Sequence, residues 1–453
     1  MAREFGHLTR KANTTTSVSL PARKNTRLQK QSRAVAKKLA SLVFAGVVAT
    51  VCILLSCETT WAQWSQWGGD ARNFNLTEST LTTIWPPSKP KLLWKHSLGD
   101  GESSVLLDNG TLYTMYRDEE KQEEVVVALS ANTGSRLWEY RYRVTIPESY
   151  FVQNGSGPHA TPLTRNGKLY ALGTTGKLHC LEQKTGKLIW AHDLVEKFGG
   201  QPPTCGYGAS PLIYENTLIV QVGGEGHAVM SFNLADGKVI WSRQDFGAGY
   251  AAPILIKIAG EEQVVVFTHG DVVGLDPKNG TLKWTHPHKT DFGVNASMPI
   301  WGKDQILFIT SAYSSGSRGL QLISDASRIS VEELWHQKKM QVHFNNVVRV
   351  GDYVYGTSGD FGPVFLMAVH AKTGAIAWQK RDIIGKASIL HSGNKLMLLD
   401  EKGKLVMVRV SPQDVMVDAT HQLLDGRVWT APTVVGTRLY VRNRKNIYAF
   451  DFK

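Results

Sequence analysis

Short runs of apolar residues, each bounded by turn residues, recur along most of the chain. One set of runs starts at residues 111, 168, 217, 263, 305, 353, 395 and 438, a spacing of about 47 residues. A second set follows these runs, with sequences such as VVVAL from residue 125 and FLMAV from residue 365. Both sets are rich in β-branched and aromatic residues, which favour pleated strands. Since each set has eight members, the pattern predicts eight repeats built from β-strands.

A Gly-x-x-x-Trp pattern marks the last hairpin of five repeats, as in Gly186/Trp190 and Gly280/Trp284. Gly tolerates the positive φ of a tight turn, and the Trp then has a fixed place on the outer strand. A large apolar ring at that place can pack between neighbouring sheets, so we expect a structural role for these residues. The Trp residues assigned to this role are Trp94, Trp138, Trp190, Trp241, Trp284, Trp335 and Trp378.

Each repeat has room for four strands, which suits a β-propeller blade. The eighth repeat reaches Lys453 without an outer strand, whereas residues 91–95 read as an outer strand with no repeat in front of it. Pairing between the two would close the ring and cover an open sheet edge. We therefore predict an all-β, eight-bladed β-propeller of four-stranded antiparallel blades over residues 91–453, closed by the strand around Trp94. Residues 63–90 are expected to form a leader that crosses its surface.

The first 62 residues differ in composition from the rest. Residues 1–38 form a basic n-region, and residues 39–62 form a hydrophobic signal or anchor segment whose uncharged part is residues 39–55. This length lies between that of a signal peptide core and that of a membrane span. Three fates remain open: cleavage after Ala62, retention as a membrane tether, and lipidation at Cys57. Each implies export, to the periplasm or cell envelope, to the outside, or to a membrane-anchored position.

The formal net charge of +12 is concentrated in this first segment, which holds ten Lys and Arg against Glu4 and Glu58. Only +4 is left for the rest of the chain. A small charge spread over a large domain is typical of an ordinary solvated surface, so we do not expect nucleic-acid binding.

Two cysteines, Cys180 and Cys205, lie in the predicted propeller. An oxidising compartment permits a disulfide between them, and two separate thiols fit the spacing equally well. No Cys and His residues occur with the spacing of a structural zinc site, so no metal is expected.

The repeat resembles a known pattern, Ala-x-Asp-x-x-Thr-Gly-x-x-x-Trp, at residues 128–138 and 368–378, with Ser130 and His370 in the Asp position. This is the repeat of the pyrroloquinoline quinone (PQQ) propeller superfamily. The resemblance covers residues 91–453, and the sequence from Gln63 resembles the Trp-x-Gln-Trp-x-Gly opening of exported bacterial members. It implies a propeller and leaves the function open, because the superfamily includes quinoprotein dehydrogenases and a non-enzymatic, BamB-like branch.

The two branches differ in the chemistry that they need. The resemblance implies that a quinoprotein would hold PQQ and Ca²⁺ on the axis with a Glu/Asn/Asp set, an Asp base, an Arg and often two adjacent cysteines. This chain has no adjacent cysteines, and its repeats are short. We therefore predict a non-enzymatic binding or scaffold propeller without a cofactor. A PQQ- and Ca²⁺-dependent oxidoreductase is the alternative.

The loops before the first strands of the blades are expected to converge on one mouth of the axial channel, where a ligand would bind. The partner is expected to be a protein, or an extracellular glycan or peptide, bound at the mouth and along the blade edges. Phe292 and Phe344 lie close to the nominated residues in sequence. The candidate contacts are His159, Tyr207, Tyr250, Asn295, Asn345 and Trp429.

Overall fold

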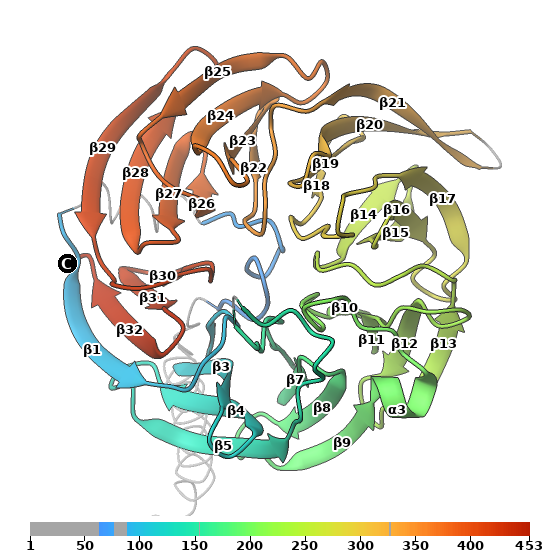
Figure 1. The fold of residues 1–453 in the computed structure, drawn as a ribbon, viewed down its shortest axis with the longest axis vertical. Helices are drawn as coiled ribbons and strands as arrows, with labels where there is room; N and C mark the ends of the chain where they lie inside the picture. Colours follow the sequence, from blue (N-terminus) through green and yellow to red (C-terminus); the bar gives the residue numbers. More distant parts are fainter. Residues whose placement is uncertain (1–62, 77–87, 154, 326–327) are drawn as a thin grey trace, which may run out of the picture. The chain divides into compact units, whose positions relative to one another are not determined.

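The computed structural model describes residues 63–76, 88–153, 155–325 and 328–453 of the chain. Eight four-stranded antiparallel sheets follow one another around a central axis in chain order (Figure 1). The predicted eight-bladed propeller is thereby confirmed. The signal, anchor and lipidation predictions for residues 1–62 lie outside the described residues. Within the described ranges, no helix has the length and apolar character needed to cross a bilayer.

The first four blades run from the innermost to the outermost strand. Blade 1 comprises β2 (Leu106–Asp108), β3 (Thr111–Asp118), β4 (Glu123–Ser130) and β5 (Arg136–Arg143). Blade 2 comprises β6 (Leu163–Arg165), β7 (Lys168–Leu172), β8 (Lys177–Glu182) and β9 (Leu188–Asp193). Blade 3 comprises β10 (Leu212–Tyr214), β11 (Thr217–Gln221), β12 (Val229–Asn233) and β13 (Val239–Arg243). Blade 4 comprises β14 (Ile254–Ile258), β15 (Glu261–Phe267), β16 (Asp271–Leu275) and β17 (Leu282–Pro287).

The other four blades have the same order. Blade 5 comprises β18 (Ile300–Trp301), β19 (Ile306–Ser311), β20 (Gly316–Ser324) and β21 (Ile329–Gln337). Blade 6 comprises β22 (Val348–Val350), β23 (Tyr353–Ser358), β24 (Phe365–His370) and β25 (Ile376–Arg381). Blade 7 comprises β26 (Ala387–Ser392), β27 (Lys395–Asp400), β28 (Lys404–Val410) and β29 (Val415–Gln422). Blade 8 comprises β30 (Thr433–Val435), β31 (Arg438–Arg442), β32 (Asn446–Asp451) and β1 (Lys91–Ser97).

Blade 8 confirms the predicted closure. Its outer strand is β1, which pairs antiparallel with β32 from Lys91 opposite Asp451 to Ser97 opposite Asn446. A segment near the start of the described chain thus completes the C-terminal sheet and covers an edge that would otherwise be open to other strands.

A single short helix, α3 (Leu194–Phe198), interrupts the described β-structure. Asp193 caps its first turn by accepting hydrogen bonds from the backbone N–H groups of Val195 and Glu196. Gly199 ends it in the left-handed conformation. Cys180 and Cys205 are separate thiols, so the structure contains no disulfide between them.

The outer-strand Trp residues connect neighbouring blades. A Cβ atom placed on Gly280 would lie 2.5 Å from the Trp241 ring of the preceding blade, so only glycine fits beneath that ring. The indole N–H of Trp241 also donates to the Pro277 carbonyl at 3.0 Å. The same ring-on-glycine contact joins Trp94 to Gly134, Trp138 to Gly186, Trp190 to Gly237 and Trp335 to Gly374. The repeated Gly-x-x-x-Trp pattern therefore encodes contacts between blades as well as a turn within each blade.

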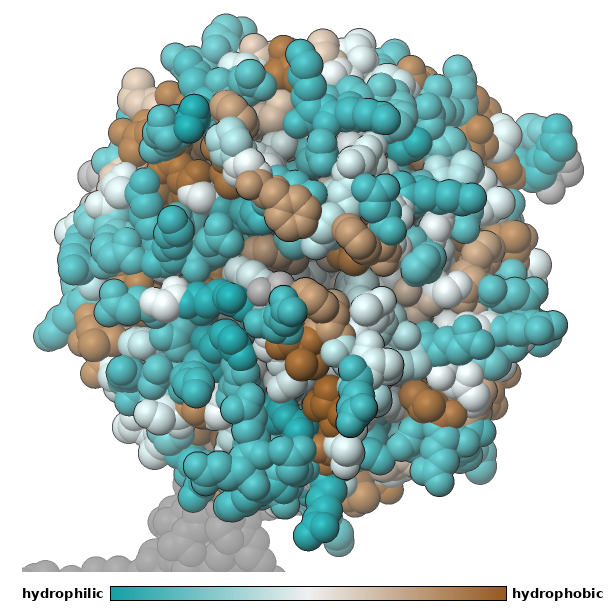
Figure 2. All heavy atoms as spheres, in the orientation of Figure 1, coloured by the Kyte–Doolittle hydropathy of each residue, from teal (hydrophilic) through white to brown (hydrophobic). Residues whose placement is uncertain are grey.

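Residues 63–76 of the leader lie across the axis and not on the outer surface. Trp64 forms a bridge with Leu107 of blade 1, and Asn75 forms one with His391 of blade 7. Trp64 and Phe74 are buried, which explains why this segment enters the ring. Viewed along the axis, the surface of the ring is mainly hydrophilic, with apolar side chains near its centre (Figure 2).

Candidate functional site

One end of the axis holds a cavity of about 600 Å³, which we call the mouth. Its wall contains eight Phe, Tyr and Trp side chains among the described residues, together with two His, one Glu and one Cys. The side chains are Trp67, Glu102, Phe151, His159, Cys205, Tyr250, Phe292, Tyr313, His343, Phe344, Phe361 and Trp429. A concave, largely apolar cavity with few polar groups is the usual form of a binding site.

Two kinds of loop supply these side chains. Tyr250, Phe344 and Trp429 come from loops that lead into the first strands of blades 4, 6 and 8. Tyr313 and Phe361 come from the turns between the second and third strands of blades 5 and 6. Both kinds of loop open at the same end of the ring, because every blade has the same strand direction.

Six rings on one side of the mouth form a connected series of ring contacts, and we call them the aromatic arc. Phe292 packs edge-on against Tyr313 with centroids 5.1 Å apart, and Tyr313 packs against His343 at 4.9 Å and Phe361 at 6.0 Å. The arc continues from His343 to Phe344 at 4.9 Å and from Phe344 to Trp429 at 4.4 Å. The members are Phe292, Tyr313, His343, Phe344, Phe361 and Trp429. Edge-to-face and tilted geometries are the favourable arrangements of aromatic rings.

Two cations lie over the end of this arc. The Lys386 ammonium is 5.8 Å from the Phe344 ring centroid, and the Arg427 guanidinium is 4.4 Å from that of Trp429. Both distances allow cation–π attraction. Burial, and then the nearby charge of Lys386, lower the pKa of His343 to about 4, so this ring is neutral at pH 7. The positive charge of this side of the mouth therefore comes from Lys386 and Arg427.

A hydrogen-bonded pair, His159 and Glu102, lies in the wall of the mouth. Nδ1 of His159 is 3.0 Å from Oε2 of Glu102. Burial alone would lower the pKa of His159, but the hydrogen bond to Glu102 and its charge outweigh that effect and raise the pKa above 6.5. The pair therefore leaves one ring nitrogen, Nε2 of His159, and one carboxylate oxygen, Oε1 of Glu102, both buried, without a hydrogen-bond partner among the described residues.

Three of the six nominated residues, His159, Tyr250 and Trp429, line the mouth, as do Phe292 and Phe344. The other three do not line it. Tyr207 is buried and donates its hydroxyl to the Val222 carbonyl at 2.6 Å.

Asn295 is fully buried in the ring. Its amide donates to the carbonyls of Thr268, His269 and His288, which makes it a loop-bracing residue. Asn345, which follows the mouth residue Phe344, is also buried and does not line the mouth. The position of a residue before a first strand placed His159, Tyr250 and Trp429 at the mouth, but it did not give the direction of every side chain.

Several mouth residues were missed from the sequence. Trp67 belongs to the leader, whose path across the axis no repeat pattern indicates. Phe361 follows Asp360 and precedes Gly362-Pro363, and this turn composition marks an exposed loop tip that carries an unexpected aromatic ring. The sequence could therefore have identified Phe361 as a candidate binding residue, because a large apolar side chain is unusual in a polar turn.

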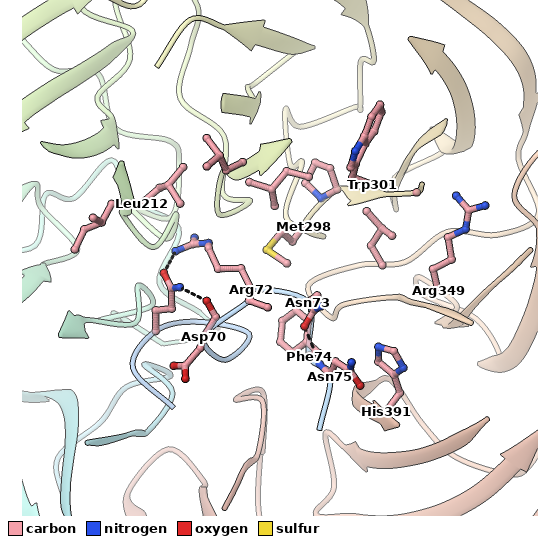
Figure 3. Close-up of a pocket in the computed structure, with 18 of the residues that line it drawn as sticks. Asp70, Arg72, Asn73, Phe74, Asn75, Leu212, Met298, Trp301, Arg349 and His391 are labelled. Atoms are coloured by element: carbon pink, nitrogen blue, oxygen red, sulfur yellow. Dashed lines mark hydrogen bonds between the residues drawn. The ribbon is translucent and has the colours of Figure 1, made fainter. Parts of the chain in front are cut away.

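The opposite end of the axis has a larger cavity, of about 930 Å³, with the leader in its wall (Figure 3). Two of its arginines, Arg72 and Arg349, are held by protein acceptors. Arg72 donates to Gln66 and to the Pro211 carbonyl, and Arg349 makes two hydrogen bonds with Asp304, at 2.9 and 2.7 Å. We regard the mouth as the candidate site because aromatic side chains, two of them strongly exposed, converge on it.

The residues of the mouth do not fit PQQ with Ca²⁺. Calcium takes six to eight oxygen ligands, whereas Glu102 is the one carboxylate among the described mouth residues and is bound to His159. Among the described residues, no group of three His, Cys, Asp or Glu is placed to hold a metal ion. The described residues of the wall include no Asp to act as a base.

Two relatives represent the two branches of the superfamily. Quinoprotein alcohol dehydrogenase PedH from Pseudomonas putida is 29% identical over 150 residues, which are 31% of this chain and 24% of that protein. Outer membrane protein assembly factor BamB from Yersinia pestis is 24% identical over 302 residues, 62% of this chain and 71% of that protein. The chain thus matches about a quarter of the length of the dehydrogenase.

Solved structures share the fold. BamB from Moraxella catarrhalis superposes with a TM-score of 0.54 and 17% identity, over 81% of this chain and 98% of that one. Quinohemoprotein alcohol dehydrogenase from Comamonas testosteroni gives a TM-score of 0.56 and 15% identity, over 86% and 80%. A family model described as outer membrane protein assembly factor BamB matches residues 122–380. Because that match covers more than half of the chain, the chain belongs to this BamB family.

Proposed function

We propose that this chain is an exported, non-enzymatic propeller that binds a protein partner at the mouth. The observation that carries the proposal is the set of aromatic side chains that converge there while remaining open to solvent. Phe361 is 88% exposed and Phe292 is 62% exposed. Exposed aromatic side chains that gather around a cavity mark an interaction site on a soluble protein.

Family membership supports the same proposal. The family description names an assembly factor for outer membrane proteins, and such a factor acts by contact with other proteins. Export is supported by the basic and hydrophobic segments before residue 63. Cleavage after Ala62, retention as an anchor and lipidation at Cys57 predict different masses and solubilities. Mass spectrometry of the protein from the cell envelope separates the three.

Site-specific photo-crosslinking tests the mouth as the partner site. A photoreactive residue replaces Phe361 in one variant and Leu137, which is 55% exposed on the outer strand β5, in the control. We expect protein adducts in the cell envelope from position 361 and few from position 137. Equal adducts at both positions would refute the mouth as a specific site.

The second candidate function is that of a quinoprotein oxidoreductase, favoured by the sequence match to PedH. The polar groups of the mouth, with Glu102 as the one carboxylate among the described residues, do not fit PQQ with Ca²⁺. Titration of the purified protein with PQQ and Ca²⁺, followed by alcohol-dependent dye reduction, tests it directly. We expect no stoichiometric quinone absorbance on the protein and no turnover. Uptake with turnover would overturn the scaffold proposal.

A further inference from the structure

The charges around the mouth restrict the chemistry of the partner. Glu102, the one acidic side chain in the described wall, is hydrogen-bonded to His159. Lys386 and Arg427 lie over the rings at the other side. A ligand that reaches the Phe344–Trp429 end of the arc therefore meets two positive charges, which favour acidic groups. Asp360 lies farther along the arc, where its Oδ2 accepts from the Tyr313 N–H.

The stacked rings and the cations form one surface. Phe344 and Trp429 are 4.4 Å apart and tilted by 37°, with Lys386 over the first ring and Arg427 over the second. An aromatic side chain of a ligand can extend the arc at its exposed members Phe292 and Phe361. A flanking carboxylate that points along the arc then faces its Phe344–Trp429 end, where the cations lie.

The wall also offers polar contacts that suit a peptide backbone. Glu102 Oε1 can accept from an amide N–H, and His159 Nε2 can donate to a carbonyl oxygen when the ring is protonated. An extended peptide presents both groups within each residue. A neutral glycan has hydroxyl groups that can bond to this pair, but it has no negative charge to interact with Lys386 and Arg427.

We propose that the mouth binds an extended peptide segment in which an aromatic side chain is flanked by Asp or Glu. The aromatic ring packs on the aromatic arc, the carboxylate lies near Lys386 and Arg427, and the backbone contacts the Glu102–His159 pair. This inference rests on the proposed function and specifies the partner's chemistry. A single-stranded nucleic acid also needs rings and cations, but it requires a positive groove along many phosphates, and the chain beyond residue 62 carries only +4.

Fluorescence anisotropy with labelled peptides and the full chain tests the proposal. Three peptides of one length carry Glu-Phe-Glu, Lys-Phe-Lys or Glu-Ala-Glu at the centre, and an oligothymidine and a neutral oligosaccharide serve as other ligand classes. We expect the Glu-Phe-Glu peptide to bind at least about tenfold more tightly than the other two peptides. Its affinity is expected to fall when the salt concentration is raised.

Matched variants locate the binding. Lys386→Gln is expected to weaken the Glu-Phe-Glu peptide several-fold and to leave the weak binding of Lys-Phe-Lys unchanged or slightly stronger. Lys303→Gln, at the opposite cavity, removes the same charge and is expected to have no effect. Thermal unfolding of both variants verifies that the ring is intact, and the peptide series itself needs no variant.

Equal affinity for the acidic and basic peptides would overturn the inference, as would tighter binding of the oligothymidine or the oligosaccharide. Failure of this inference can be distinguished from failure of the proposed function. Protein adducts at position 361 without peptide selectivity would refute only the acidic-aromatic chemistry. Selective peptide binding without adducts in cells would refute the mouth as the partner site in the cell envelope.

Discussion

The two sides of blade 4 are joined to their neighbours by different chemistry. On one side, the Trp241 ring of blade 3 lies on Gly280 and its indole donates to the Pro277 carbonyl. On the other side, Trp284 donates to Oε1 of Gln263 in its own blade at 2.8 Å. Blade 5 has no Gly-x-x-x-Trp turn; its last hairpin is formed by the nine-residue strands β20 and β21. Because blade 5 lacks this glycine, the Trp284 ring cannot make the contact that Trp241 makes with Gly280.

Polar groups replace the ring-on-glycine contact between blades 4 and 5. His288, fully buried after β17, contacts Ser315 Oγ through Nε2 and the Arg318 guanidinium through Nδ1, both at 2.9 Å. Glu333 contacts both His286 and Arg318 at 2.9 Å. Blade 4 is thus held to blade 3 by a ring contact without titratable groups, and to blade 5 by groups that titrate. The first contact should not depend on pH, whereas the second should.

The largest expected effect breaks the apolar contact. Gly280→Ala places a methyl group against the Trp241 ring at a φ of +72°, and we expect a loss of about 3 kcal/mol of unfolding free energy. Gly260→Ala in the same blade, at a φ of +89° with open space, controls for backbone strain and is expected to cost about 1 kcal/mol. Urea unfolding measures both, and equal losses would show that the ring contact contributes nothing.

A smaller effect is expected from acid on the polar side. Burial, and then the charge of Arg318 and two neighbouring histidines, lower the pKa of His288 to about 3. The unfolded chain takes up a proton below pH 6.5 while folded His288 remains neutral, so stability falls as the pH falls from 6.5 towards 3. At pH 4.5 this costs on the order of 2 kcal/mol.

Urea unfolding at pH 7 and pH 4.5 measures this acid penalty. His288→Gln keeps a hydrogen-bonding side chain and is expected to shrink the penalty, because other buried histidines remain. Hydrogen exchange then locates the change, which we expect in β17 and β20 and not in β13. An unchanged penalty in the variant would assign the acid sensitivity to another part of the ring.

The smallest effect sharpens the difference between the two Trp residues. Trp284→Phe leaves Gln263, which is fully buried, without its hydrogen bond, and we expect a loss of about 1.5 kcal/mol beyond that of the lost ring area. The double variant Trp284→Phe/Gln263→Met is expected to recover part of the loss. No recovery would contradict the assignment of the cost to the unpaired amide.

The sequence predicted the ring because the same contact is repeated with the same spacing. Trp94 illustrates this: its strand had no repeat in front of it, and pairing with the last blade was the remaining way to complete a sheet. The different hydrogen bond of Trp284 was not predictable, since its partner depends on the turn of the next blade, which has lost the pattern.

The mouth was only partly predictable. Tyr250 and Trp429 follow from their position before a first strand, and Tyr207 has a similar position but turns inward to reach the Val222 carbonyl. Such a choice depends on which buried carbonyl lacks a donor, and the sequence does not display it. Trp67 depends on a path across the axis that no local pattern specifies.

Because β1 pairs with β32, the ring can close only in a chain that contains both strands and all the blades between them. Every residue between position 97 and position 446 must be synthesised and delivered before the first strand finds its partner. A polypeptide cut short at any point in between leaves β1 single and another blade unfinished, with backbone groups that remain open to proteases and to other chains. Closure of the ring therefore requires a chain that extends at least through β32, to Asp451.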